Sequence, residues 1–187
     1  MSFGYQVLGF GSGASGRAPY TLSYLVIGGG GGGGGQGGAG AGGGGYRNSY
    51  AADTYSGRNS SIETAPTVAT GIVLTIDIGA GGGINDPSNG SQGESTVITG
   101  TGFSTITSLG GGYGNHSGPG QSGGCGGGAG FLSTSGGAGT AAQGFDGGHG
   151  LGHASPYAGG GGGGTSQDGA VTPSPSVGGA GGNGLAS

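Results

Sequence analysis

Three histidines, His116, His149 and His153, are the residues of this sequence best suited to chemistry. His149 and His153 lie four residues apart, a spacing at which a helix would bring two imidazoles together on one metal ion. The segment between them reads GHGLGHA, which is too rich in glycine to form that helix, and Asp146 is the nearest further ligand. We therefore expect no metal site, and interpret the histidines as solvated turn residues or as contacts to a ligand.

A second chemical pattern follows the apolar residues 24–27, where Gly28, Gly30 and Gly33 fit the dinucleotide-binding spacing GxGxxG. Such a site needs a helix whose N-terminus meets the pyrophosphate, and the following GQGGAGAGGGG cannot form one. The sequence also contains no lysine for a phosphate-binding P-loop. We therefore expect no cofactor.

Nucleophilic catalysis has candidate groups in this sequence but no framework to align them. The single cysteine, Cys125, lies in the block GGCGGG, and we interpret it as a small residue among glycines. Serines, histidines and Asp146 could be combined into a triad, yet no GxSxG turn follows a strand. The sequence therefore predicts no catalytic residues, and we do not expect an enzyme.

The composition excludes several further classes of protein. Gly accounts for 62 of the 187 residues, whereas a usual domain contains about 7% Gly. Collagen would require Gly at every third position and more than the seven prolines present. The basic residues are Arg17, Arg47 and Arg58, too few to bind nucleic acid or an anionic membrane surface. No apolar stretch is long enough for membrane insertion.

Short apolar runs, each followed by a glycine block, predict a small β-sheet near the N-terminal half of the chain. They cover about residues 24–27, 72–78 and 95–108. In GIVLTIDIG every second residue from Ile72 to Ile78 is apolar, which is typical of a half-buried strand. We expect the other two runs to pair with this strand, and residues 46–71 to form a surface excursion.

From about residue 110 to residue 187 apolar periodicity disappears, and several glycines recur at intervals of three, as in Gly144, Gly147 and Gly150 and in Gly178, Gly181 and Gly184. Three is the period of the polyproline II helix, here polyglycine II, which makes no internal hydrogen bonds and must therefore bond to its neighbours. The predicted fold is mostly irregular and β, with the small sheet, a polyglycine II bundle over about 110–187, and essentially no α-helix. The glycines expected to pack inside the bundle are Gly144, Gly147, Gly150, Gly178, Gly181 and Gly184.

The order of segments over residues 20–187 resembles the glycine-rich domains of tailed-phage tail-fibre proteins and related receptor-binding adhesins. The segments that carry this resemblance are YLVIGGGGGGGG, GYRNS, GIVLTIDIGAGGG, TVITG, AGTAAQGFDGGHG and GGAGGNGLAS. The resemblance implies a polyglycine II body that serves as a fibre shaft or tip in the virion, and is extracellular after release. It implies partners among host cell-surface receptors, protein or glycan, and other tail or fibre proteins. A homo-oligomer is also possible.

The opening residues 1–20 do not follow that pattern. We interpret them as an attachment or oligomerisation segment that precedes a fibre domain over residues 21–187. Two other functions stay open for the whole chain. One is a subunit of an extracellular filament, and the other is an ice-binding protein that displays a flat face of Ala and Thr.

Recognition of a host is expected at turns that carry Tyr, His and Asn, because these side chains offer contact area and hydrogen bonds at low entropic cost. If this interpretation holds, the turns should lie together at one end of the bundle. The alternative is that they are ordinary turn residues. The candidates are Tyr113, Asn115, His116, Phe131, His149, His153 and Tyr157.

Overall fold

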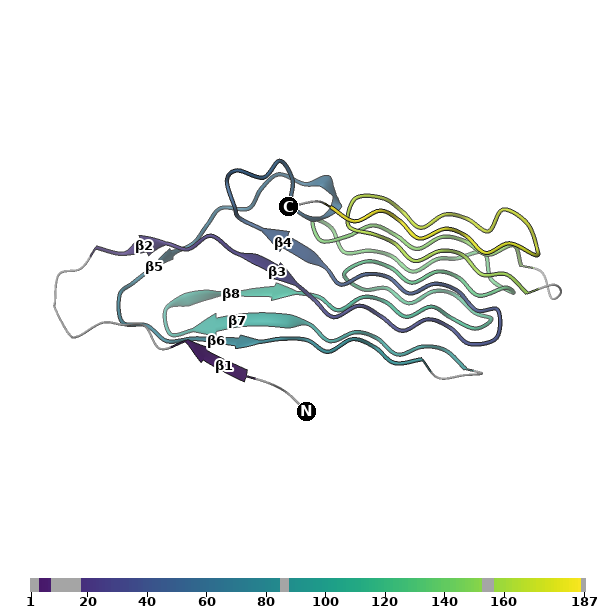
Figure 1. Ribbon diagram of the computed structural model, residues 1–187, viewed down its shortest axis with the longest axis horizontal. Coiled ribbons are helices and arrows are strands. Elements are labelled where there is room, and N and C mark those ends of the chain that lie inside the picture. Colours follow the sequence, from purple (N-terminus) through teal and green to yellow (C-terminus); the bar gives the residue numbers. More distant parts are fainter. Residues whose placement is uncertain (1–3, 8–17, 85–87, 153–156, 186–187) are drawn as a thin grey trace.

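The molecule is elongated, with the β-strands in one half and runs of glycine-rich backbone lying side by side in the other (Figure 1). The computed structural model describes residues 4–7, 18–84, 88–152 and 157–185. Among these residues the one helical element is the short 3-10 turn η1 (Gly57–Asn59). None of them forms a helix long and apolar enough to cross a membrane. The mostly irregular and β fold without α-helix is therefore confirmed for the described chain.

Three antiparallel sheets make up the β-stranded half. The largest has the order β1-β6-β7-β8, and the two smaller sheets pair β2 with β5 and β3 with β4. The strands are β1 (Gly4–Val7), β2 (Tyr20–Thr21), β3 (Leu25–Ile27), β4 (Tyr46–Asn48), β5 (Thr67–Val68), β6 (Leu74–Asp77), β7 (Thr96–Gly100) and β8 (Phe103–Ser108).

The predicted strand over 72–78 is confirmed as β6, and the run over 95–108 forms β7 and β8 with a turn at Gly102, whose φ is 72°. The expected partner of residues 24–27 was wrong. β3 pairs with β4, and not with β6, because the glycine segments between β3 and β4 form a hairpin that returns the chain beside β3. Residues 46–71 are therefore not simply a surface excursion, since they contain β4 and β5.

One apolar cluster joins the three sheets. The half-buried residues Ile72, Leu74 and Ile76 pack against it, as the alternation of apolar residues in this segment predicts. Ile78, the last residue of that alternation, is exposed. The buried members of the cluster are Tyr24, Val26, Val68, Ile98, Phe103 and Ile106.

A polar link beside this core ties β4 to the segment that follows η1. The Arg47 guanidinium donates from Nε to Oε1 of Glu63 at 2.9 Å, and the Tyr24 hydroxyl donates to Oε2 at 2.7 Å. Burial alone would raise the pKa of Glu63, but the hydrogen bonds from Arg47 and Tyr24 hold that pKa below its ordinary value of 4.5. At neutral pH Glu63 is therefore ionised, and its carboxylate links Arg47 and Tyr24 through hydrogen bonds.

The glycine-rich half is held together by hydrogen bonds between the backbones of neighbouring segments. Segment 125–130 lies at its centre, is buried throughout, and donates an N–H from every residue. Residues three apart bond to the same neighbour: 125 and 128 to segment 39–45, 126 and 129 to segment 144–152, and 127 and 130 to segment 118–122. Any three consecutive residues of this segment therefore donate hydrogen bonds to three different neighbouring segments.

Segment 28–35 has the same period of three. Its residues 28, 31 and 34 donate to segment 39–45, and residues 29, 32 and 35 donate to segment 88–94. Gln36 and Gly37 reverse the chain between the first two segments, with φ of 44° and 72°. The glycine body therefore extends beyond residues 110–187 to include the glycine blocks between the strands, while the polyglycine II conformation itself stays a prediction.

Glycine is required where these backbones meet. A Cβ built at Gly144, Gly147 or Gly150 would lie closer than 3.0 Å to atoms of segment 124–130. The expectation for Gly178, Gly181 and Gly184 was wrong, because a Cβ there meets no atom closer than 3.6 Å. A Cβ at Gly179 or Gly182 would instead lie about 2.1 Å from a carbonyl oxygen of the neighbouring segment. In this outer segment the glycines that face a neighbour are therefore one residue further along the chain than expected.

This difference predicts opposite effects for two matched substitutions. Gly147→Ala should destabilise the protein by about 1–3 kcal/mol, because the added methyl group overpacks two backbones. Gly181→Ala should be neutral or stabilising by about 0.4–1 kcal/mol, since the alanine restricts the unfolded chain and has space in the folded one. Thermal unfolding followed by circular dichroism measures both. Equal shifts in the two variants would contradict the packing described.

The Glu63 link predicts a specific sensitivity to acid. A carboxyl group whose pKa is lowered by folding contributes stability above its unfolded pKa, and this contribution is lost as the pH falls through the folded pKa. Glu63→Gln should therefore melt at a lower temperature than the native chain at pH 7, and the difference should shrink as the pH falls below 4.5. Asp77→Asn, at an exposed carboxylate of β6, is the control and should melt like the native chain. A Glu63→Gln difference that persists undiminished to low pH would refute this role.

Candidate binding surface at the tip of the glycine body

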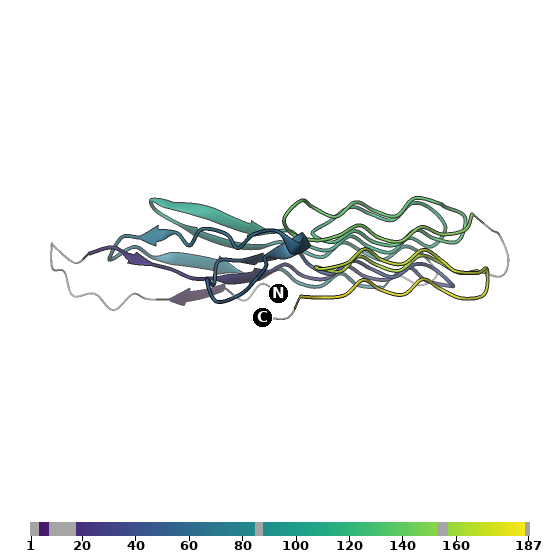
Figure 2. The same cartoon turned by 90° about the horizontal axis from the view of Figure 1, so that it is seen from above.

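Several turns of the glycine body meet at the end that lies farthest from the strands (Figures 1 and 2). The reason is the antiparallel path of the chain, because segments of similar length that start at the sheets, or at turns of the body beside them, must all reverse at the opposite end. We call this end the tip. Its described residues are 35–38, 84, 88–89, 115–119, 130–133, 149–152, 157 and 172–177.

His116 connects three of the turns at the tip. Its backbone N–H donates to Oδ1 of Asn89 at 2.9 Å, and its Nδ1 lies 2.8 Å from the carbonyl oxygen of Gly35. A carbonyl oxygen only accepts hydrogen bonds, so Nδ1 carries the proton in this arrangement. The ring also meets Phe131 edge to face, with centroids 5.3 Å apart. His116 is therefore a half-buried organising residue.

Phe131 is the centre of a row of aromatic rings. Its ring centroid lies 4.5 Å from that of Tyr157, at an interplanar angle of 55°, in addition to its edge contact with His116. Only 8% of Phe131 is exposed, whereas 58% of Tyr157 is exposed. Offset or edge-on pairs of this kind are favourable beyond their buried area. Phe131 thus anchors the row, and Tyr157 presents it to solvent.

The other predicted residues have different surroundings. Asn115 caps its own turn, with Oδ1 accepting from the N–H groups of Ser117 at 3.1 Å and Gly118 at 2.8 Å. Tyr113 is half-buried along the body, and His149 is exposed, while its carbonyl accepts from the buried Thr172. His153 lies outside the described residues.

Exposed aliphatic side chains complete the surface at the tip, and the sequence analysis did not identify them. Ile84 has 71% of its surface exposed, and each of the others exposes a third or more. In the sequence they are scattered among polar and glycine-rich turns, and Leu132 alone adjoins another apolar residue, Phe131, so only the path of the chain reveals that they share one end. They are Ile84, Leu132, Leu151 and Val177.

Two groups that could carry chemistry elsewhere are occupied structurally. Asp146 accepts from the Arg58 guanidinium at 2.9 Å and from the Gly139 N–H at 2.8 Å, and the Arg58 hydrogen bond lowers the pKa of Asp146. Cys125 is fully buried, and burial raises the pKa of its thiol to about 11. The thiol is therefore protonated at neutral pH, and thiolate is the nucleophilic form. Within the described ranges, no three His, Cys, Asp or Glu residues are grouped so that they could hold a metal ion.

The aromatic row predicts a clear difference between two neighbouring residues. Phe131→Ala should destabilise the protein by about 3 kcal/mol, because it leaves a cavity between His116 and Tyr157. Leu132→Ala should change stability little, since half of that side chain is already exposed. Thermal unfolding of both variants tests this, and equal stabilities would show that Phe131 does not anchor the tip.

Comparison with known proteins adds one finding. A family model described as a glycine-rich domain matches residues 9–187. No curated protein and no solved structure matches the chain. The match begins ahead of residue 20, so it includes part of the opening segment that the resemblance to tail-fibre domains leaves out.

Proposed function

We propose that this chain, which belongs to the glycine-rich domain family, is a structural and adhesive module of a phage tail fibre. In this proposal the glycine body is a bundle of polyglycine II helices, and the tip contacts a receptor on the host cell surface. The observation that carries the proposal is the convergence of turns from distant parts of the sequence at one end of the body, where they gather exposed aromatic and aliphatic side chains.

The body has the properties that a fibre module requires. Its segments bond to one another through backbone groups at intervals of three residues, as expected for polyglycine II helices packed side by side. Because such bonds link several segments at once, local opening of one segment breaks contacts with all its neighbours. A body of this kind supports resistance to proteases and a fixed position of the turns.

The chemistry of the tip favours a receptor that is not strongly charged. None of the described tip residues is Lys or Arg, and Tyr157 offers an exposed ring held in place by Phe131. Exposed Leu132 and Val177 add apolar area on separate turns. Rigid aromatic residues that stand on fixed loops are typical of binding surfaces. A protein or glycan receptor on the host fits this surface better than a polyanion does.

An adsorption experiment tests this function. The fluorescently labelled chain is mixed with host cells of the phage that carries it, and bound fluorescence is measured for the native chain and for the double variant Leu132→Ser and Tyr157→Ser. Binding by the variant should fall by roughly tenfold or more, because exposed anchors at the centre of an interface dominate binding. Thermal unfolding should be nearly unchanged, since both side chains are about half exposed.

The matched control replaces two exposed apolar residues away from the tip, Val73→Ser and Ile78→Ser. This control should adsorb like the native chain. Full adsorption by the tip variant would place recognition elsewhere. Absence of cell binding by the native chain, combined with filament growth at rising concentration, would favour the filament subunit instead.

A further inference from the structure

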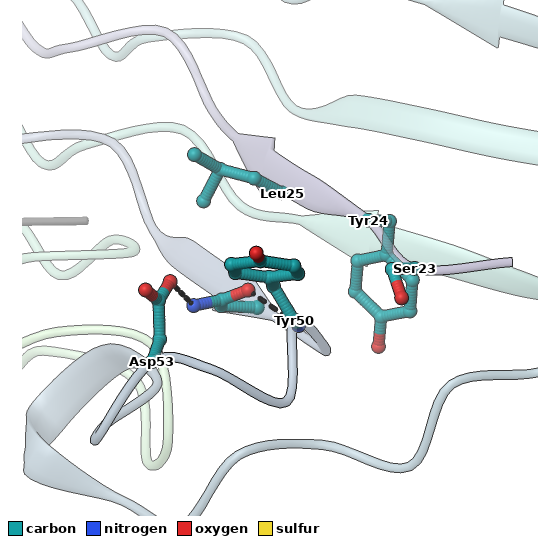
Figure 3. A pocket seen from close by; sticks show the side chains of 6 residues that line it. Ser23, Tyr24, Leu25, Tyr50 and Asp53 are labelled. Carbon is teal, nitrogen blue, oxygen red and sulfur yellow. Dashed lines mark hydrogen bonds between the residues drawn. The ribbon is translucent and has the colours of Figure 1, made fainter.

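A hollow of about 380 Å³ lies in the β-stranded half, away from the tip (Figure 3). One wall comes from the start of β3, and the other from the turn that follows β4. We call it the Tyr50 groove. The residues that line it are Ser23, Tyr24, Leu25, Asn48, Tyr50 and Asp53.

The polar side of the Tyr50 groove is fixed by hydrogen bonds. Asn48 is fully buried, and its Nδ2 donates to Oδ2 of Asp53 while its Oδ1 accepts from the N–H of Tyr50 at 2.8 Å. The N–H of Asp53 in turn donates to the Tyr50 carbonyl at 3.0 Å. Among the described residues the hydrogen bond to the Asp53 carboxylate is made at Oδ2, so Oδ1 of this oriented group is left to accept from a ligand.

The apolar side of the groove is an aromatic platform. In Figure 3 the Tyr50 ring lies between Asp53 and Tyr24, with Leu25 above it. Tyr50 is 55% exposed although its backbone is held at both its N–H and its carbonyl. Tyr24 is held by its hydroxyl, which donates to Glu63 at 2.7 Å. The groove therefore presents an exposed ring beside fixed hydrogen-bonding groups.

The aromatic ring and the hydrogen-bonding groups of the groove together limit which ligands could bind there. The hollow has the size of a site for a small molecule, since such pockets range from about 300 to 1,000 Å³. Asp53 disfavours anions, and the guanidinium of Arg47 in β4, which could otherwise attract one, is already paired with Glu63. A purely apolar ligand would leave the carboxylate and the Ser23 hydroxyl without partners. A neutral molecule that has hydroxyl groups on its edges and a C–H face satisfies both sides.

We propose that the Tyr50 groove binds a neutral saccharide, with one pyranose ring packed on Tyr50 and its hydroxyl groups donating to Asp53. The proposal concerns a second binding site in the other half of the molecule and does not depend on adhesion through the tip. If both sites operate, the chain contacts a glycan through the groove and a receptor through the tip.

Saturation-transfer NMR tests this site directly. The probes are glucose, galactose, mannose and N-acetylglucosamine, each with its β-linked disaccharide. At least one probe should receive magnetisation at its ring protons from the native chain. Tyr50→Ala and Asp53→Asn should each weaken binding of that probe by roughly tenfold, because each removes one of the two kinds of contact. Tyr50→Phe should retain binding, since the ring face remains.

The double variant Leu132→Ser and Tyr157→Ser should bind the same probe as the native chain does, which separates the groove from the tip. Thermal unfolding of every variant shows whether the protein is still folded, and Tyr50→Phe provides the folded reference. Transfer to none of the probes would overturn the proposal. Unchanged binding by Tyr50→Ala, or loss of binding in the tip variant alone, would overturn it as well.

Discussion

The structure depends on hydrogen bonds between extended backbones that repeat at every third residue. They require the backbones to approach so closely that a Cβ at most interior positions would collide with a carbonyl group of the next segment. Each glycine costs about 0.5–1 kcal/mol more than alanine in backbone entropy. The abundance of glycine is therefore a packing requirement, because the network that offsets this cost cannot form with larger residues.

This constraint determines where larger side chains are found. The interior of the glycine body accepts few of them, and Cys125 and Ala129 are among the buried exceptions. Larger apolar residues are consequently placed at the two ends, in the core that joins the three sheets and in the turns of the tip. Both proposed binding sites follow from this division, since recognition needs side chains that the body cannot carry.

Sequence reasoning recovered features that depend on local period. The alternation through Ile72, Leu74 and Ile76 predicted a half-buried strand. The turns that carry His116, Phe131 and Tyr157 were expected to lie together only if they recognise a host, a role that stays a proposal although the three rings are in contact. The prediction that Gly181 packs against a neighbouring segment was wrong, because a spacing of three does not say which glycine in each group of three faces that neighbour. Sequence reasoning also missed β4 and the Tyr50 groove, which form only when the hairpin of residues 28–45 returns the chain beside β3.

Amide hydrogen exchange measured by NMR over segment 28–35 tests the central claim most directly. The N–H groups of Gly28, Gly29, Gly31, Gly32, Gly34 and Gly35 donate to neighbouring segments, whereas those of Gly30 and Gly33 donate no backbone hydrogen bond to any described residue. The account predicts slow exchange at the first six and faster exchange at Gly30 and Gly33, a pattern with a period of three. Uniformly fast exchange, or protection that alternates with a period of two as at the edge of a β-sheet, would contradict it.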